Sequence, residues 1–421
     1  MAFVRVMYYY WFMSITTPPK DFQIMFLDMN SFFASVEQQV RPELRGCPVG
    51  VTPYTEDSGC VIAASYEAKQ QGVKIARVSE AKMICPTIKI VEARPALYMV
   101  YHKEIKRAIE HFTPYFKACS VDEFEIRLTP RDQSREAAEK LAGNIKRYIK
   151  ESVGDYLRCS IGIGPSYFLA KLAGERKKPD GLTTLQLKYL KNFYSKIKLT
   201  DIPGINIKME ANLKILGINS PTDLYNFNLP DLTRTLKHWG RLWYFRLRGF
   251  EVDEMIIKNK TIGHSHVLPP EHRTKLGAEA VLTKLIHKAG YRIRKEGYQA
   301  GGVYVCIGFM GVSTFHQGKV FSPFCDDRTF YENAASILKN CPWRGRPINV
   351  AVSAFNLSKL GGDQISIFAE IEKRKAIARA LDAINDEFGA DTIYPASEYL
   401  AKESAPDRIP FGQPRYDIKH G

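Results

Sequence analysis

The sequence predicts a multidomain α+β protein, on three grounds. Its 421 residues exceed one typical domain and suggest about two to four. Hydrophobic residues make up 45% and charged residues 25%, a globular balance that argues against extensive disorder. From residue 23 to residue 176, apolar runs and amphipathic stretches alternate as strand, helix, strand, helix, strand, helix. We therefore expect a sheet with helices layered on one face.

The N-terminal half opens with an apolar run of strand length, residues 23–29. A helix over 32–39 follows, which Asn30 or Ser31 can cap. Further strands are expected within 50–65, 116–128 and 158–164, and further helices over 65–72, 79–84, 96–112, 134–151 and 165–176.

The C-terminal half has a helical pattern over 189–250, then a stretch that looks like a linker over 251–270. After Gly361 we expect a tail with one helix over 371–388. The unit between linker and tail is expected to contain helices over 275–295 and 331–339 and extended segments over 302–309, 314–321 and 348–355.

The net charge of +15 and the pI near 9.3 indicate a polyanionic partner, nucleic acid before membrane. Residues 260–359 contain 14 Lys and Arg against 6 Asp and Glu, a net charge of +8. This concentration suggests one domain devoted to phosphate contacts. A basic protein without such a partner is the alternative that charge alone leaves open.

The eight cysteines are scattered and form no CxxC pair, so we expect no zinc site and a reducing cytosol. The apolar run from Met7 to Ile15 is too short to span a bilayer and makes a poor signal peptide. We therefore interpret residues 1–22 as an extension or as the product of a wrongly assigned start, and we expect a cytoplasmic protein without membrane attachment.

Three acidic residues are candidates for metal binding. Asp28 closes the first strand, and Asp122-Glu123 lie in the apolar context SVDEFEI. In a regular strand the adjacent pair would point to opposite faces, but near a bend both can serve one cluster. Three carboxylates from two strands suit Mg²⁺, and two such ions suit phosphoryl transfer. For each acid taken alone, a solvated or salt-bridged role is the alternative.

Five segments, in order and within residues 26–355, resemble motifs of the Y-family (lesion-bypass) DNA polymerases. They are FLDMNSFFASVEQQVRPELRGCPVGV, AASYEAKQQGVK, ACSVDEFEIRLT, SIGIGPSYFLAKLAGERKKPDGL and DIPGINIKMEANLKILGI. The resemblance implies a right-hand polymerase with a ferredoxin-like palm, small fingers, a helical thumb and an α/β little finger. The implied domains are palm 23–188 with fingers at about 38–95, thumb 189–250, little finger 251–360 and tail 361–421.

By matching position, the resemblance also implies site residues. Asp28, Asp122 and Glu123 correspond to the catalytic metal-binding carboxylates, with the Met29 carbonyl as a further ligand of two Mg²⁺ ions, or of Mn²⁺ in their place. Phe33 corresponds to a steric gate against the 2′-hydroxyl of ribonucleotides. The residues implied in triphosphate binding are Tyr66, Lys69 and Lys178, where the family more often has Arg in place of Lys69.

DNA contacts are implied in two places. Gly204 and Asn206 lie in a helix-hairpin-helix that holds a DNA phosphate, although the family usually has a second glycine where Asn206 stands. Arg292, Arg294 and Lys295 cluster near one helix end of the implied little finger, with a solvated helix face as the alternative.

The pentapeptide QISIF resembles the segment that docks bacterial polymerases on the sliding clamp. Gln364 would supply hydrogen bonds, and Ile367 and Phe368 would fill an apolar pocket. The expected function is error-prone DNA synthesis from dNTPs on primer-template DNA by a monomer associated with the nucleoid. The alternatives are a catalytically silent, clamp-bound adaptor and a plain DNA-binding protein, but the three retained carboxylates argue for activity.

Overall fold

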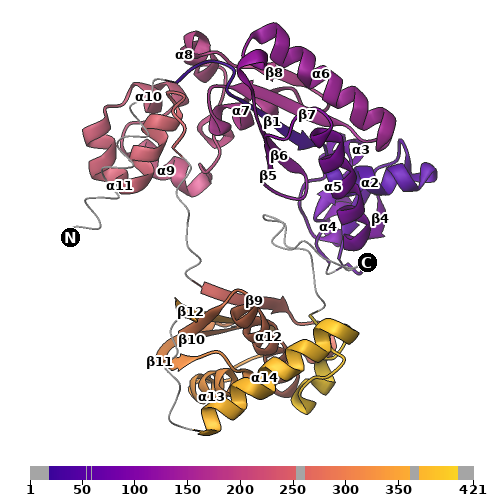
Figure 1. The fold of residues 1–421 in the computed structure, drawn as a ribbon, viewed down its shortest axis with the longest axis vertical. Helices are drawn as coiled ribbons and strands as arrows, with labels where there is room; N and C mark the ends of the chain where they lie inside the picture. Colours follow the sequence, from indigo (N-terminus) through magenta and orange to yellow (C-terminus); the bar gives the residue numbers. More distant parts are fainter. Residues whose placement is uncertain (1–18, 54, 58, 253–260, 361–368, 406–421) are drawn as a thin grey trace. The chain divides into compact units, whose positions relative to one another are not determined.

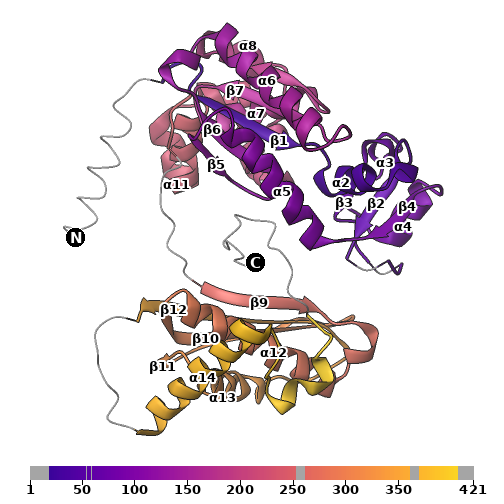
Figure 2. The same ribbon diagram turned by 45° about the vertical axis from the view of Figure 1, so that its right-hand side comes forward.

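The computed structural model describes residues 19–53, 55–57, 59–252, 261–360 and 369–405. The chain divides into two compact units between Met255 and Ile256. Figures 1 and 2 show the elements of each unit from two directions. Among the described residues, no helix combines the length and the apolar character that crossing a membrane requires.

The first unit is built on a five-stranded sheet in the order β5-β6-β1-β7-β8. The central strand β1 runs antiparallel to β6 and β7, and β8 pairs parallel with β7. All six residues of β1 are buried, as in a strand that is covered on both faces. The strands are β1 (Ile24–Met29), β5 (Phe116–Ala118), β6 (Glu123–Arg127), β7 (Cys159–Gly164) and β8 (Leu182–Thr184).

Helices cover both faces of this sheet, so the expectation of helices on one face was wrong. α5 (Pro95–Glu110) and α6 (Arg135–Ser152) share a core with the face of β1 that carries Leu27. α7 (Tyr167–Gly174) packs on the opposite face, against Phe26. The sequence shows strand order but not the face on which each helix packs.

α7 approaches β7 very closely. A Cβ atom at Gly162 of β7 would lie only 1.9 Å from the carbonyl oxygen of Ala170 in α7. A larger residue at position 162 would therefore push the helix off the sheet. This contact fixes where the side chains of α7 meet β1 and β6.

A small lobe adjoins the sheet, with its own three strands in the order β3-β2-β4. Its core consists of small side chains, with Ile88 the largest of them. The lobe and its connecting helix contain α2 (Phe32–Val40), β2 (Val49–Thr52), β3 (Ala63–Ala64), α3 (Tyr66–Gln70), α4 (Val78–Ile84) and β4 (Lys89–Glu92).

A helical region completes the first unit and shares a core with Leu169 and Leu172 of α7. Its centre is the fully buried Trp243, and its last helix is interrupted at Lys237, where φ is 53°. The helices are α8 (Leu190–Tyr194), α9 (Ile207–Ile215), α10 (Pro221–Asn226) and α11 (Leu229–Arg246). Short 3₁₀ helices of this unit are η1 (Pro42–Leu44), η2 (Pro130–Asp132), η3 (Glu175–Lys177), η4 (Leu187–Tyr189) and η5 (Leu199–Asp201).

The second unit has a four-stranded antiparallel sheet in the order β11-β10-β12-β9. The helices α12 and α13 share its apolar core, in which Phe330 of α13 is fully buried. The elements are β9 (Thr261–Val267), η6 (Pro270–His272), α12 (Lys275–Lys295), β10 (Tyr298–Phe309), β11 (Phe315–Phe324), α13 (Asp327–Leu338), β12 (Pro347–Lys359), α14 (Ala369–Phe388) and η7 (Ala396–Ala401).

The expected linker over 251–270 is wrong for residues 261–267, which form β9 and pair with β12. Ile262 and His266 are the buried residues of this strand. Because histidines at positions 264 and 266 follow the inward phase, the strand lacks the apolar alternation by which strands are recognised.

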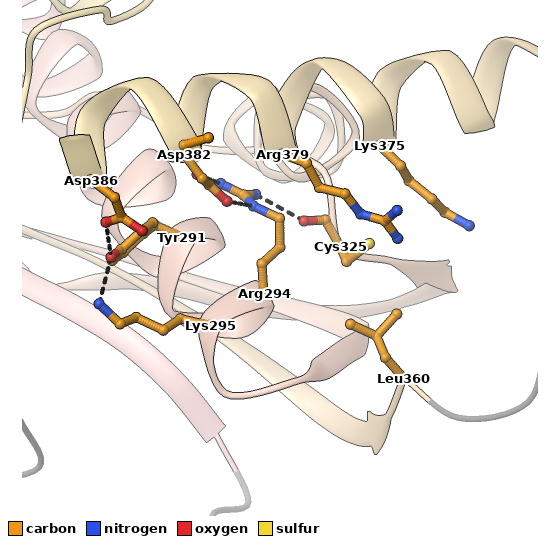
Figure 3. A pocket seen from close by; sticks show the side chains of 10 residues that line it. Tyr291, Arg294, Lys295, Cys325, Leu360, Lys375, Arg379, Asp382 and Asp386 are labelled. Carbon is orange, nitrogen blue, oxygen red and sulfur yellow. Dashed lines mark hydrogen bonds and ion pairs between the residues drawn. The ribbon is translucent and has the colours of Figure 1, made fainter. Parts of the chain in front are cut away.

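The C-terminal segment, residues 369–405, packs against α12. One side of α12 carries polar residues spaced three or four apart, and each of them binds this segment. Figure 3 shows two of these contacts between α12 and α14. The pairs are Lys284 Nζ with Asp391 at 2.9 Å, His287 Nδ1 with Glu398 at 3.3 Å, Tyr291 OH with Asp386 at 2.6 Å and Arg294 Nε with Asp382 at 2.6 Å.

Arg294 is enclosed and lies between two carboxylates, those of Asp327 and Asp382. Its side chain is 8% exposed, and it also donates to Asp327 at 2.6 Å and to the Cys325 carbonyl at 2.9 Å. Burial lowers the pKa of Arg294, but Asp382 and Asp327 raise it more, so the net shift is upward. One guanidinium therefore ties α14 to α12 and α13.

Arg294→Ala should destabilise the second unit by about 3 kcal/mol or more, because it removes the guanidinium that binds both Asp327 and Asp382, whose side chains are only 18% and 16% exposed. Chemical denaturation of the full chain checks this. Arg374→Ala is the control, since its ion pairs with Glu332 and Glu370 are screened by solvent and its loss should be much smaller. Equal losses in the two variants would contradict the assigned role of Arg294.

Candidate active site

Strand pairing brings two of the predicted acidic residues face to face. Asp28 of β1 lies directly opposite Glu123, the first residue of β6. Residues paired in this way project to the same face of a sheet, with Cβ atoms about 5 Å apart. This is the face on which α7 packs, because Asp28 and Phe26 are two residues apart.

Asp122 belongs to the same neighbourhood. It ends the turn between β5 and β6, where its carbonyl oxygen accepts a hydrogen bond of 2.9 Å from the Met29 amide. Its carboxylate accepts a bond of 2.5 Å from the Ser120 hydroxyl. The turn thus supplies the bend that would allow the adjacent Asp122 and Glu123 to serve one cluster.

Two lysines neutralise these carboxylates. Lys178 Nζ lies 2.7 Å from Asp28 and 2.6 Å from Glu175. Lys171 Nζ, from α7, donates to both carboxylate oxygens of Glu123, at 2.7 and 2.9 Å. The predicted phosphate ligand Lys178 is therefore held by an acid of the site.

At Asp28, the effect of burial on the pKa outweighs that of the neighbouring ammonium group. Burial, the largest cause, raises the pKa of Asp28, the Lys178 ammonium lowers it, and Asp122 and Glu175 raise it, with a net value of about 6. For Lys178, burial lowers the pKa, but Asp28 and Glu175 raise it more, and the net shift is upward. Because this carboxyl group is 8% exposed and has a raised pKa, an additional cation beside it would stabilise its charged form.

The donors present fit a divalent ion in type. In the described residues, no three acidic, histidine or cysteine side chains converge closely enough to hold a metal. Instead, the ammonium groups of Lys178 and Lys171 form ion pairs with Asp28 and Glu123. Both carboxylates therefore already bind a cation. Carboxylate oxygens are the ligands that Mg²⁺ and Mn²⁺ prefer. For the three carboxylates to bind one metal cluster, Lys178 would have to leave Asp28 and Lys171 would have to leave Glu123.

Phe33 stands at the start of α2 with its ring partly exposed, whereas Phe32 is buried in the core. The Phe33 ring stacks on Tyr98 with centroids 4.4 Å apart. Tyr98 in turn donates to the fully buried Glu37 at 2.9 Å, and Arg94 pairs with the same carboxylate at 2.6 Å. This stack fixes one face of the predicted gate.

Tyr66 and Lys69 lie on α3, which Ser65 caps. Lys69 Nζ donates to the Ser31 hydroxyl at 2.7 Å, so α3 meets the start of α2. Burial and the nearby Lys178 lower the pKa of Lys69. Burial raises the pKa of Tyr66, with Lys178 opposing that effect. The three predicted phosphate ligands thus lie within electrostatic reach of one another.

Asn30 joins β1 to the loop that carries Lys178. Its side-chain oxygen accepts from the Asp180 amide at 2.6 Å, and its amide nitrogen donates to Ser160 at 2.9 Å. These contacts hold the loop after η3 beside the end of β1, where Lys178 reaches Asp28. Sequence reasoning had treated Asn30 only as a helix cap.

The helical region shows a different use of Asn206 from the one expected. Gly204 has the left-handed φ of 92°, but Asn206 has φ −91° and caps α9 by accepting from the Met209 amide at 2.9 Å. The turn therefore needs one left-handed residue, Gly204. A residue that can cap, rather than a second glycine, suits position 206.

The predicted basic cluster of the second unit is engaged within that unit. Arg294 is buried in the ion pairs described above, so it is not placed to contact DNA phosphates. Arg292 lies 3.4 Å from Glu296, and Lys295 donates to Tyr291 at 2.6 Å. The clamp residues Gln364, Ile367 and Phe368 lie outside the described residues.

Sequence reasoning missed several residues that shape the site. Lys171, Glu175 and Ser120 each lie inside the resembling segments. Ser120 is two residues from Asp122, whereas only folding brings Lys171 against Glu123. The signal in the sequence that could have pointed to these residues was the position of Glu175 between two lysines, Lys171 and Lys178.

Two family models match the chain. The model of the impB/mucB/samB family matches residues 27–175, and the model of that family's C-terminal domain matches residues 259–367. The first span contains Asp28, Asp122 and Glu123. The second span ends before α14, so the C-terminal segment lies beyond it.

Similar proteins extend over most of the chain. A DNA polymerase IV of Moorella thermoacetica is 32% identical over 386 residues, which cover 89% of this chain and 96% of the relative. A DNA polymerase IV of Pelotomaculum thermopropionicum is 29% identical over 381 residues, covering 88% and 94%. The fold matches a Y-family DNA polymerase chimera with a TM-score of 0.67 at 23% identity, over 79% of this chain and 98% of the other.

Asp28→Asn should stabilise the first unit near pH 7.5 in the absence of divalent metal. A carboxyl group whose pKa rises on folding binds its proton more tightly in the folded chain, so its ionisation above about pH 6 costs folding free energy. The gain should be on the order of 1–2 kcal/mol near neutral pH and should vanish below about pH 4.

Thermal unfolding of both proteins in chelator across this pH range measures the gain. A variant that is less stable than wild type at every pH would show instead that the Lys178 ion pair outweighs the burial of Asp28.

Proposed function

Because the chain belongs to the Y family of DNA polymerases and so catalyses DNA-directed DNA synthesis, we propose that it uses two-metal nucleotidyl transfer in error-prone synthesis past damaged template bases. The observation that carries the proposal is the direct pairing of Asp28 with Glu123 across β1 and β6, with Asp122 in the adjoining turn. Its substrates are primer-template DNA and dNTPs.

The polymerases of this family generally use divalent metal ions, and we propose two Mg²⁺, or Mn²⁺ in their place. When bound, such ions supply charge neutralisation at the attacking and leaving oxygens. Asp28, Asp122 and Glu123 would hold them, with the Met29 carbonyl as a further ligand. The burial of Asp28 in the sheet keeps its carboxylate oxygens in a fixed position, which supports its role as a metal ligand.

Tyr66, Lys69 and Lys178 would bind the triphosphate. The Tyr66 hydroxyl and two ammonium groups can donate to phosphate oxygens. Lys178 would then exchange Asp28 and Glu175 for phosphate, which frees the Asp28 oxygens. Lys69 donates as a point charge rather than as a bidentate group, so its hold on phosphate is less directional than that of Arg.

Phe33 would exclude ribonucleotides. Its ring rests on Tyr98, whose hydroxyl is fixed by Glu37, so the ring cannot retreat from a 2′-hydroxyl without breaking the stack. A ring held rigidly in this way supports steric exclusion of nucleotides that carry a 2′-hydroxyl.

DNA binding would use the Gly204 turn and, in the second unit, Arg292 and Lys295. The amide groups of a turn with left-handed φ can hold a phosphate without reading sequence. We further propose, from the QISIF sequence alone, that a bacterial sliding clamp binds residues 364–368, and that the chain acts as a monomer at the nucleoid.

Asp122→Ala should reduce Mg²⁺-dependent primer extension at least about a thousandfold and leave primer-template binding unchanged, because it removes a metal ligand and no DNA contact. Gel extension and fluorescence anisotropy measure the two properties. Glu151→Ala, a carboxylate exposed on α6, is the control and should extend normally. Retained extension by Asp122→Ala would remove this residue from the metal site.

Phe33→Ala should reduce the preference for dNTP over rNTP about 10- to 100-fold, since the ring that meets the 2′-hydroxyl is gone. Single-nucleotide insertion with matched dNTP and rNTP gives the ratio of kcat/KM. Tyr115→Ala, an exposed aromatic in the same unit, should keep the wild-type ratio. An unchanged ratio in Phe33→Ala would reject the gate.

A further inference from the structure

Lys171 lies on α7, which packs closely on the sheet, and it forms an ion pair with Glu123. Its ammonium group donates to both Glu123 oxygens, at 2.7 and 2.9 Å, and within the described residues this is its one ion pair. Both side chains are largely enclosed, at 26% and 22% exposure. The contact therefore occupies both oxygens that a metal would use.

The ammonium group of Lys171 also lies over an aromatic ring. Its ammonium lies 5.1 Å from the centroid of the buried Phe26 ring, and Tyr167 meets the same ring edge-on at 5.6 Å. The close approach of α7 to β7 at Gly162 sets the height of the helix above the sheet. The packing of α7 on the sheet therefore directs the Lys171 side chain to Glu123.

The charges explain why a cation is needed there. Asp28, Asp122 and Glu123 gather at the end of one strand pair, and like charges directly opposite each other destabilise a sheet. Lys178 pairs with Asp28 and Glu175, which leaves Glu123 to Lys171. Without Lys171, Glu123 would face Asp28 with no counter-charge of its own.

We propose that Lys171 is a resting counter-cation of the active site: it holds Glu123 while no metal is bound, and a divalent ion must displace its ammonium from that carboxylate. This inference rests on the proposed two-metal function. It assigns Lys171 a positioning role, in which the lysine stabilises the empty site and sets the affinity for metal without contacting substrate.

Lys171 differs from Lys178 in what releases it. Lys178 has a second anionic partner in Glu175 and faces the side of α3, where phosphate would bind. Lys171 projects from α7, and its ion pair within the described residues is with the metal-binding carboxylate of Glu123. Nucleotide can therefore draw Lys178 away, whereas the metal itself has to compete with Lys171.

Removal of this competitor should strengthen metal binding. Lys171→Met keeps an unbranched side chain but loses the charge, so Mn²⁺ titrated alone into the full chain should bind about three- to tenfold tighter than to wild type. Electron paramagnetic resonance of free Mn²⁺, without DNA or nucleotide, measures this affinity. Unchanged or weaker binding would overturn the proposal, because an anchor that merely orients Glu123 predicts a loss.

The control is Lys117→Met, on β5 of the same sheet, where Lys117 pairs in register with Glu125 and is exposed. It makes the same change in net charge and should bind Mn²⁺ as wild type does. An equal gain in Lys117→Met would show a general charge effect and reject the specific role of Lys171.

Thermal unfolding provides a second readout. Without metal, Lys171→Met should unfold at a lower temperature than wild type, and Mn²⁺ should raise its midpoint by more. An equal metal-induced shift in both proteins would count against displacement. If Lys171→Met does not fold, Lys171→Gln retains a polar contact without the charge, and the same tightening is expected.

Asp122→Ala separates this inference from the proposed function. Loss of Mn²⁺ binding in Asp122→Ala, together with no gain in Lys171→Met, would reject the counter-cation and leave the metal site intact. Undiminished Mn²⁺ binding in Asp122→Ala would reject the metal site itself.

Discussion

The direct pairing of Asp28 with Glu123 is the constraint on which the rest of the site depends. Antiparallel register places two carboxylates at the closest cross-strand spacing, and the adjoining turn adds Asp122. Such an arrangement is unfavourable without cations. The surrounding elements answer this need, since the loop after η3 delivers one lysine to Asp28 and α7 delivers another to Glu123.

How far the sequence could predict this site depends on what a residue's role requires. Asp28 and Glu123 were found because their motifs are local and matched a family in order. Lys171 was missed because its partner lies 48 positions away in sequence. Only the packing of α7 on the sheet decides which carboxylate it meets. The strand β9 was missed because histidines take its inward positions, so the apolar alternation that marks a strand is absent.

Charge composition predicted the partner but not each contact. The excess of basic residues in 260–359 suggested phosphate binding, yet Arg294 is bound to Asp327 and Asp382. Sequence composition counts a buried and an exposed guanidinium equally. Asn206 is a similar case. Its tolerance of left-handed φ predicts a residue of the turn, but in the structure it caps α9.

The docking of the C-terminal segment on α12 bears on where the protein can be shortened. The matched family domain ends at residue 367, which suggests a natural point of truncation. A chain ending there would lose Asp382, Asp386 and Glu398 together and would uncover a stripe of polar side chains whose partners were internal. A shortened version therefore needs compensating substitutions along α12. Without them, a loss of activity would reflect damage to the second unit.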